Sequence, residues 1–261
     1  LDRVALAADL GFDAPTSNSV DATSDRDFLL EFVQALELLV LHLSRWAEEM
    51  ILFSTAEYGF LSLPEAYSTG SSAMPQKKNP DLLELVRGKA GRIVGAATAL
   101  LVTMKGLPLA YNKDMQETQE PLFDAAQTAL SILPLVTAWM KQAEFDFMRM
   151  QQTAESGFMN AWAAATYLVE RGVPSRLAHE AVGKAVKVCI ERGCQLQDLG
   201  LAELQKFHPA FDRDVFPALV LEAVLAIHNV EGGTAPTQVT RAIERAEQRI
   251  AHLRGEAHAH A

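Results

Sequence analysis

The sequence is short of cysteine and of long apolar runs, and each shortage excludes a class of protein. Only two cysteines, Cys189 and Cys194, occur among 261 residues, which is too few for a disulfide-built secreted scaffold and typical of a reducing compartment. The longest apolar run, Ile93–Met104, falls short of the ~20 residues that a helix needs to span a bilayer. We therefore expect a cytoplasmic protein with two free thiols and no membrane as partner.

Positive charge is also scarce. The chain has 23 Lys and Arg residues against 33 Asp and Glu residues, for a formal net charge of −10. Such a chain repels the phosphates of nucleic acids and anionic lipid surfaces, so we expect neither as a partner. A small anionic substrate would need a local cluster of basic groups against this background.

Strand patterns are missing as well. No period-two alternation of useful length occurs, so the predicted fold class is all-α. Residues 26–55 contain no Gly or Pro, and residues 81–104 contain no Pro. We expect residues 1–144 to form part of a long-helix bundle. Gly and Pro are frequent from 145 to 261, which predicts a small helical C-terminal domain with helices near 160–171, 175–192 and 237–253.

The helix predicted over 26–55 is apolar on nearly all sides. One face has its residues at helical spacing, namely Leu36, Leu39, Leu43, Trp46, Met50 and Phe53, and the opposite face carries Phe28, Phe32, Leu38 and Leu41. A helix of this kind is buried among other helices, and at ~1.5 Å per residue it would be ~45 Å long. We expect other chains to complete the bundle, so that the isolated chain associates in solution.

Local signals predict how the long helices begin and pack. Ser24 and Asp27 have the spacing of a capping box ahead of the helix over 26–55. Residues 57–72 are predicted to be a loop. Gly88, Gly91 and Gly95 share one face of the helix over 81–104, and this spacing indicates close packing against another helix.

The stretch from Thr69 to Glu84 holds the most chemistry. It opens with a conformationally permissive Gly and two hydroxyls at Ser71 and Ser72, and continues with two ammonium groups at Lys77 and Lys78. Asn79 is predicted to cap the following helix, with Pro80 as its first residue. Ammonium groups beside a helix N-terminus form a site for an anion. A second polar cluster follows downstream over residues 111–117.

A serine in such a loop could act in two ways. As an acyl-transfer nucleophile it would need the G-x-S-x-G elbow after a strand, and the chain has neither feature. As a proton-abstracting base it would need its alkoxide stabilised, which Lys77, backbone N–H groups and the helix N-terminus would all do. The same donors would stabilise the dianion formed when a proton leaves the carbon next to a carboxylate.

The residues of this stretch match a known family. They closely resemble the signature GSSxMPxKxNxxxxE of the fumarase/aspartase superfamily. The downstream run from Lys105 to Glu117 resembles argininosuccinate lyase and its relative delta-crystallin, as do residues 24–28 and 232–236. The resemblance covers essentially the whole chain.

The resemblance implies a reaction and roles within it. Argininosuccinate would be cleaved by β-elimination to arginine and fumarate, with no metal or organic cofactor. Ser71 would be the base that removes the Cβ proton, with Ser72 beside it. Lys77 and Asn79 would hold the succinyl carboxylate and stabilise the aci-carboxylate intermediate. Glu84 would orient the catalytic groups, although it could instead be only an i,i+3 partner of Arg87.

The resemblance also implies a shared site. Tyr111 and Gln116 would bind the arginine end of the substrate, and Gln119 would contact a substrate carboxylate. The family usually has Lys at the position of Gln119, so the charge there is lost. The family forms a homotetramer of long helices, and each of its active sites is assembled from three subunits.

One family segment is not found in this sequence. It resembles T-x-H-x-Q, and its His takes part in acid–base chemistry. The sequence also begins inside a helix-like pattern at Leu1. We therefore expect a C-terminal portion of a lyase that is inactive alone. Two other functions stay open, a non-catalytic crystallin-like or regulatory relative and a lyase of the superfamily with another succinyl substrate.

Overall fold

The computed structural model describes residues 1–259, with side chains described to residue 255. The chain divides into two compact units, the first over Leu1–Asp146 and the second beginning at Phe147. Each unit has its own core. The fold class is all-α, as predicted, and the described strands are two residues long, β1 (Leu61–Ser62) and β2 (Glu144–Phe145), paired antiparallel.

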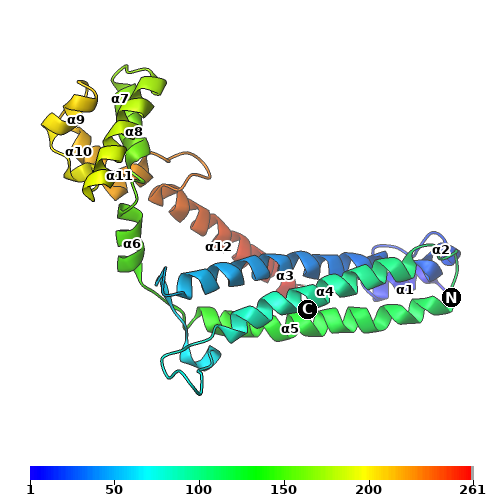
Figure 1. Ribbon diagram of the computed structural model, residues 1–261. Helices are drawn as coiled ribbons and strands as arrows, with labels where there is room; N and C mark the ends of the chain where they lie inside the picture. The colour runs from blue at the N-terminus through cyan, green and yellow to red at the C-terminus, as the bar shows by residue number, and fades with distance from the viewer. Residues whose placement is uncertain (260–261) are drawn as a thin grey trace. The chain divides into compact units, whose positions relative to one another are not determined.

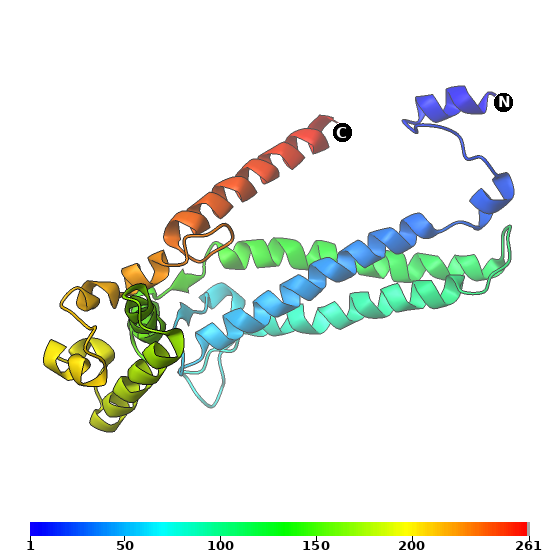
Figure 2. The ribbon, with the colours of Figure 1, turned by 90° about the horizontal axis from the view of Figure 1, so that it is seen from above.

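Three long helices make up most of the first unit. They are α3 (Asp27–Ser54), α4 (Asp81–Met104) and α5 (Gln119–Met140), and they lie side by side in both views (Figure 1, Figure 2). Met50 of α3 packs near Leu83 of α4, while Val33 of α3 packs near Leu100 at the other end of α4. The α3 and α4 helices are therefore antiparallel, and their predicted extents are confirmed to within one residue.

The core between these helices is formed by two clusters along the bundle. Small side chains such as Ala90, Ala97 and Ala125 occupy one cluster, which brings the helix axes close together. Trp139 fills the other cluster, where its ring meets Trp46 edge-on with centroids 5.3 Å apart. Fully burying one such aromatic or aliphatic side chain contributes ~1.5–3 kcal/mol. These helices therefore depend on one another more than on local propensity.

Shorter elements precede and join the long helices. They are α1 (Arg3–Asp9), α2 (Ser19–Ser24), the 3₁₀ turn η1 (Glu65–Tyr67) and the 3₁₀ helix η2 (Lys113–Thr118). The capping box predicted for Ser24 and Asp27 is wrong, because Ser24 ends α2 and its hydroxyl donates to the carbonyl of Asp21. The backbone N–H of Asp27 instead donates to the Asp25 carboxylate at 2.9 Å.

The second unit contains the remaining helices. They are α6 (Phe147–Glu155), α7 (Ala161–Glu170), α8 (Ser175–Arg192), the 3₁₀ turn η3 (Leu196–Asp198), α9 (Leu201–Phe207), α10 (Val215–Ala218), α11 (Leu221–Ala226) and α12 (Pro236–Ala259). The three helices predicted here are present as α7, α8 and α12. Residues of α7 to α10 surround one core that includes Leu168, Cys189 and Phe211.

Large apolar side chains remain exposed on the long helices. Phe28, Phe32, Leu38 and Leu41 of α3 are 48–63% exposed. Gly88, Gly91 and Gly95 also face outward, and a Cβ atom added at any of them would meet nothing within 4 Å. Within the described residues, the close packing predicted at these glycines is therefore wrong. Both faces are available to a partner outside this chain.

One stretch has the length and composition of a membrane span, Lys113–Met140 across η2 and α5. The expectation based on unbroken apolar runs overlooked it, because polar residues such as Thr128 and Ser131 interrupt the run. Core helices of globular proteins pass the same test. Ala125, Ala129 and Ile132 of this stretch pack in the cores that α5 shares with α3 and α4.

Candidate active site

The loop from Thr69 to Pro80 is closed at its base by the backbone. The Asn79 N–H donates to the Thr69 carbonyl at 2.8 Å, and the Thr69 N–H reaches the Asn79 carbonyl at 3.4 Å, which makes an isolated antiparallel bridge. The Thr69 N–H also donates to the Asp81 carboxylate at 2.8 Å. The two ends of the loop are thereby held together at the start of α4.

The cap predicted at the start of α4 is wrong. Pro80 occupies the N-cap position and Asp81 is the first helical residue, with no side-chain capping hydrogen bond. Asn79 is engaged elsewhere, since its side-chain amide donates to the Thr69 hydroxyl at 3.4 Å and its backbone forms the bridge. Asp81 and Glu84 lie in the first turn of α4, where negative charge interacts favourably with the helix dipole.

Ser71 lies at the turn inside this loop. Its Oγ accepts hydrogen bonds from the N–H groups of Ala73 at 3.2 Å and Met74 at 3.3 Å. Ser71 is half-buried, and Ser72 is exposed. Hydrogen bonds donated to an oxygen favour its charged form over its neutral form. The local backbone therefore favours an alkoxide at Ser71, as a base in this position requires.

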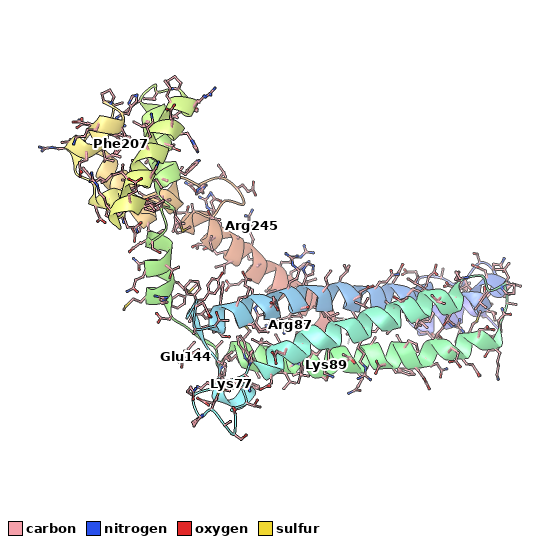
Figure 3. All side chains as sticks on the ribbon, viewed as in Figure 1. Lys77, Arg87, Lys89, Glu144, Phe207 and Arg245 are labelled. Atoms are coloured by element: carbon pink, nitrogen blue, oxygen red, sulfur yellow. The ribbon has the colours of Figure 1, made fainter. Side chains whose placement is uncertain are left out.

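The two lysines of the loop have different surroundings. Lys78 forms an ion pair with Glu65 of η1. Lys77 is exposed, and no described carboxylate lies within ion-pair distance of it. Figure 3 shows Lys77 in the loop that precedes α4. Its ammonium group is the one available to an anion from solution.

Glu84 is accompanied by a cation. Its carboxylate lies 4.0 Å from the guanidinium of Arg87, one turn further along α4, and Arg87 also pairs with Glu48 of α3. Figure 3 labels Arg87 on α4. The i,i+3 pair considered from the sequence is therefore present. Both side chains are partly exposed, and such surface pairs contribute only ~0–1 kcal/mol.

The second polar cluster lies at the opposite end of α4. Tyr111 and Gln116 follow the C-terminal end of this helix, Gln119 is the first residue of α5, and all three side chains are exposed. The α4 helix has 24 residues, which at ~1.5 Å per residue separates its two ends by ~36 Å. Within one chain, the structure does not bring these residues together with Ser71 and Lys77.

Thr69 and Asp81 received no role from the sequence, yet they hold the loop closed. The role of Asp81 as an acceptor could have been predicted, because an Asp in the first turn of a helix is placed to accept from backbone N–H groups. Its partner could not, because Thr69 lies 12 residues earlier and meets Asp81 only in the folded loop. Among the described residues, no three of His, Cys, Asp or Glu are placed to hold a metal ion.

A charged cluster in the second unit has shifted pKa values. The Tyr167 hydroxyl donates to the Asp214 carboxylate, which also pairs with Arg171. The Arg171 guanidinium lies 3.7 Å above the centre of the Tyr167 ring. The hydrogen bond from Tyr167, together with Arg171, lowers the pKa of Asp214. This cluster fixes α7 to the start of α10 and contains no residue predicted for the site.

Two protein families match this chain by sequence. One, described as "Lyase", matches residues 2–95, and the other, described as "Argininosuccinate lyase C-terminal", matches residues 158–226. A protein named argininosuccinate lyase from Koribacter versatilis is 55% identical over 96% of this chain and 54% of its own length. One of the same name from Acidobacterium capsulatum is 56% identical over 97% of this chain and 52% of its own length.

Solved structures with the same fold include two of an EDDS lyase. A crystal structure of EDDS lyase in complex with formate has a TM-score of 0.78 and 27% sequence identity, and it covers 94% of this chain and 51% of that one. A variant of the same enzyme, with bound fumarate, has a TM-score of 0.75 and 26% identity over the same share of each chain. The chain thus spans about half the length of the relatives it matches.

Proposed function

The chain belongs to the argininosuccinate lyase family, and we propose on that basis that it supplies the C-terminal half of an argininosuccinate lyase. The reaction is a β-elimination that splits argininosuccinate into arginine and fumarate. The observation that carries this proposal is the environment of Ser71, whose Oγ accepts two backbone N–H groups in a loop that also presents Lys77.

The loop supplies the first half of the chemistry. Ser71, as an alkoxide, takes a proton from Cβ of the succinyl group, and the electron pair of that bond moves onto the adjacent carboxylate. Lys77 and Asn79 hold this carboxylate and stabilise the resulting dianion. Glu84, which lies beside Arg87, orients the loop from α4. Ser72 lies next to the base and contacts substrate.

The second half of the reaction needs an acid. When the dianion collapses, the bond between Cα and nitrogen breaks and its electron pair goes to the nitrogen of the departing arginine, which accepts a proton. None of the loop residues assigned here supplies that proton. It comes from a group outside the loop, so the loop contributes the base and the carbanion stabilisation only.

The substrate's other end is bound by a different copy of the chain. Tyr111, Gln116 and Gln119 lie ~36 Å from the loop along α4, farther than one small substrate can reach. The exposed apolar faces of α3 support assembly with other copies. A homotetramer with shared active sites would bring the two clusters together and cover the apolar faces of α3. We place this assembly in the cytoplasm.

A direct test joins this chain to the missing half of a relative. The N-terminal half of the Acidobacterium capsulatum protein, cut where the match begins, is fused ahead of Leu1 or expressed with the chain. We expect fumarate release from argininosuccinate, followed by ultraviolet absorbance, and none from either half alone. A folded, assembled chimera that releases no fumarate would contradict the proposal and favour a non-catalytic relative.

One residue, Gln119, favours an alternative substrate in place of argininosuccinate. Gln119 keeps a hydrogen-bond donor but lacks the charge that the family usually has there, which weakens binding of a carboxylate. The structural likeness to EDDS lyase includes a variant with bound fumarate. The same chimera is therefore assayed with other N-substituted succinates, and a higher kcat/KM on one of them would reassign the substrate.

A further inference from the structure

The α8 helix ends in a tight turn at Gly193. Gly193 follows the helix in the left-handed conformation, with φ of +66°. The Cys194 N–H donates to the Cys189 carbonyl at 3.0 Å, and the Gly193 N–H donates to the Ile190 carbonyl at 3.3 Å. This pair of bonds is the Schellman motif, in which the residue after the glycine folds back onto the last turn of the helix.

The motif places the two cysteines of the protein side by side. The positions that meet in a Schellman motif are ordinarily both apolar, and here they are Cys189 and Cys194. Cys189 is fully buried in the core of the second unit, and Cys194 is half-buried and packs against the same core. The chain has no other cysteine.

We propose that Cys189 and Cys194 form a reversible intramolecular disulfide that locks the C-terminal end of α8. The hydrogen bond between their backbones brings the two residues within reach of a disulfide, which joins Cα atoms about 4.4–6.8 Å apart. No change of fold is needed, because the thiols already lie on the same side of the turn.

The oxidant is a low-molecular-weight disulfide such as glutathione disulfide. Cys194, the more exposed thiol, loses its proton and attacks one sulfur, forming a mixed disulfide and releasing one glutathione. Cys189 then attacks the Cys194 sulfur, releases the second glutathione and loses its own proton. Two protein thiols are oxidised and one glutathione disulfide is reduced to two thiols.

The order of these steps follows from the two environments. Burial raises the pKa of Cys189 to about 11, and a hydrogen bond with Cys194 adds to this. Cys189 is therefore almost entirely the thiol near neutral pH, so it does not attack glutathione disulfide first, and its later attack requires transfer of its proton to the departing glutathione thiolate. Cys194 in a mixed disulfide presents its sulfur directly to Cys189.

The experiment incubates the full chain with graded ratios of glutathione disulfide to glutathione, then unfolds it at low pH and blocks the remaining thiols with a maleimide in denaturant. Mass spectrometry should show both thiols lost together, with no glutathione attached and no link between chains, and dithiothreitol should restore them. A stable glutathione adduct on Cys194, disulfide-linked dimers, or two intact thiols at the most oxidising ratio would each overturn the proposal.

A matched variant separates the disulfide from general oxidation. Cys194→Ser keeps a small polar side chain at a half-buried position. In this variant Cys189 should remain a free thiol at every glutathione ratio, and maleimide should label it only after the chain is unfolded. Oxidation should raise the thermal midpoint of the wild-type chain by a few degrees, because closing a loop restricts the unfolded state. It should leave the midpoint of Cys194→Ser unchanged, and an equal rise in both proteins would contradict the proposal.

Discussion

A serine hydroxyl is a weak base in water, because nothing there stabilises its alkoxide enough. At Ser71 two backbone N–H groups donate to Oγ, and hydrogen bonds donated to an oxygen favour its charged form. The nucleophile alternative for this serine lacks the strand and elbow that it needs. The sequence predicts Ser71 as the base, and that assignment stays a prediction, whereas the two donors could not be predicted because they depend on the fold of the loop.

The Ser71→Ala variant of the complete protein tests the base. We expect kcat to fall by about 10²–10⁴-fold, the usual contribution of a positioned acid or base. Circular dichroism should show unchanged helicity, because the loop adds nothing to the bundle core. The matched comparison is Ser72→Ala, which removes a proposed substrate contact and should raise KM more than it lowers kcat. Equal losses in both variants would mean that the base is wrongly assigned.

The lowered pKa of the Asp214 carboxyl group predicts how the stability of the second unit changes in acid. The Tyr167 hydrogen bond, with Arg171, lowers the pKa of Asp214 in the folded state, so the unfolded chain binds a proton more readily. The stabilisation is present above the unfolded pKa of about 3.9 and is lost as pH falls through the lower folded value.

The comparison is between wild type and Asp214→Asn. We expect the denaturant midpoint of wild type to fall more steeply with acidification between about pH 5 and pH 3, because only wild type has this carboxylate to protonate. The denaturant midpoint at each pH is measured by far-ultraviolet circular dichroism. Parallel curves for the two proteins would show that Asp214 does not contribute to the acid response.

At the scale of single elements, length decided what the sequence could predict. The α3, α4 and α8 helices are long, so their apolar spacing repeats often enough to be recognised. The α9, α10 and α11 helices have four to seven residues, and the sequence does not predict them because so short a segment holds only about one or two turns, too few for a periodic pattern to be recognised. Asn79 was misassigned as a cap because its contact with Thr69 is tertiary.

The closure at the base of the loop leads to a prediction for α4. Asp81→Ala removes the acceptor for the Thr69 N–H, a bond to a charged group worth about 1.5–3 kcal/mol. We expect kcat/KM to fall about tenfold or more, with helicity unchanged. Asp81→Asn keeps a carbonyl acceptor and should retain most of the activity. If both variants were fully active, the bond would have no part in holding the loop.

At the scale of the whole molecule, the two polar clusters are separated by the length of α4. The helix predicted over residues 81–104 already implies this separation, whereas the way in which one copy of the chain meets another could not be predicted from the sequence. The glycines of α4 show the same limit. Their spacing indicated a packed face, and in the described chain that face is exposed.

Mixed assemblies test the sharing of sites. Complete proteins that carry Ser71→Ala or Gln116→Ala should each be nearly inactive. Unfolded together and reassembled, they should recover about a quarter of wild-type activity, since random mixing leaves that share of sites with both intact contributions. Activity after mixing is compared with each variant reassembled alone. No recovery would mean that one chain supplies both clusters.

Exposed apolar residues predict the behaviour of the isolated chain. Phe28, Phe32, Leu38 and Leu41 leave one face of α3 uncovered, and apolar faces of this extent mark interaction surfaces. Light scattering should show a mass above that of one chain, and Phe32→Glu with Leu41→Glu should lower it. A monodisperse single chain of wild-type sequence would contradict the prediction.

The uninterrupted α4 helix also acts as a spacer of fixed length. One inserted or deleted residue would shift everything beyond it by ~1.5 Å and turn it by ~100° about the axis. If, as proposed, the loop at one end and the polar cluster at the other serve different active sites, a single such change would misalign two sites at once. Side chains along α4 can therefore be exchanged far more freely than residues can be gained or lost.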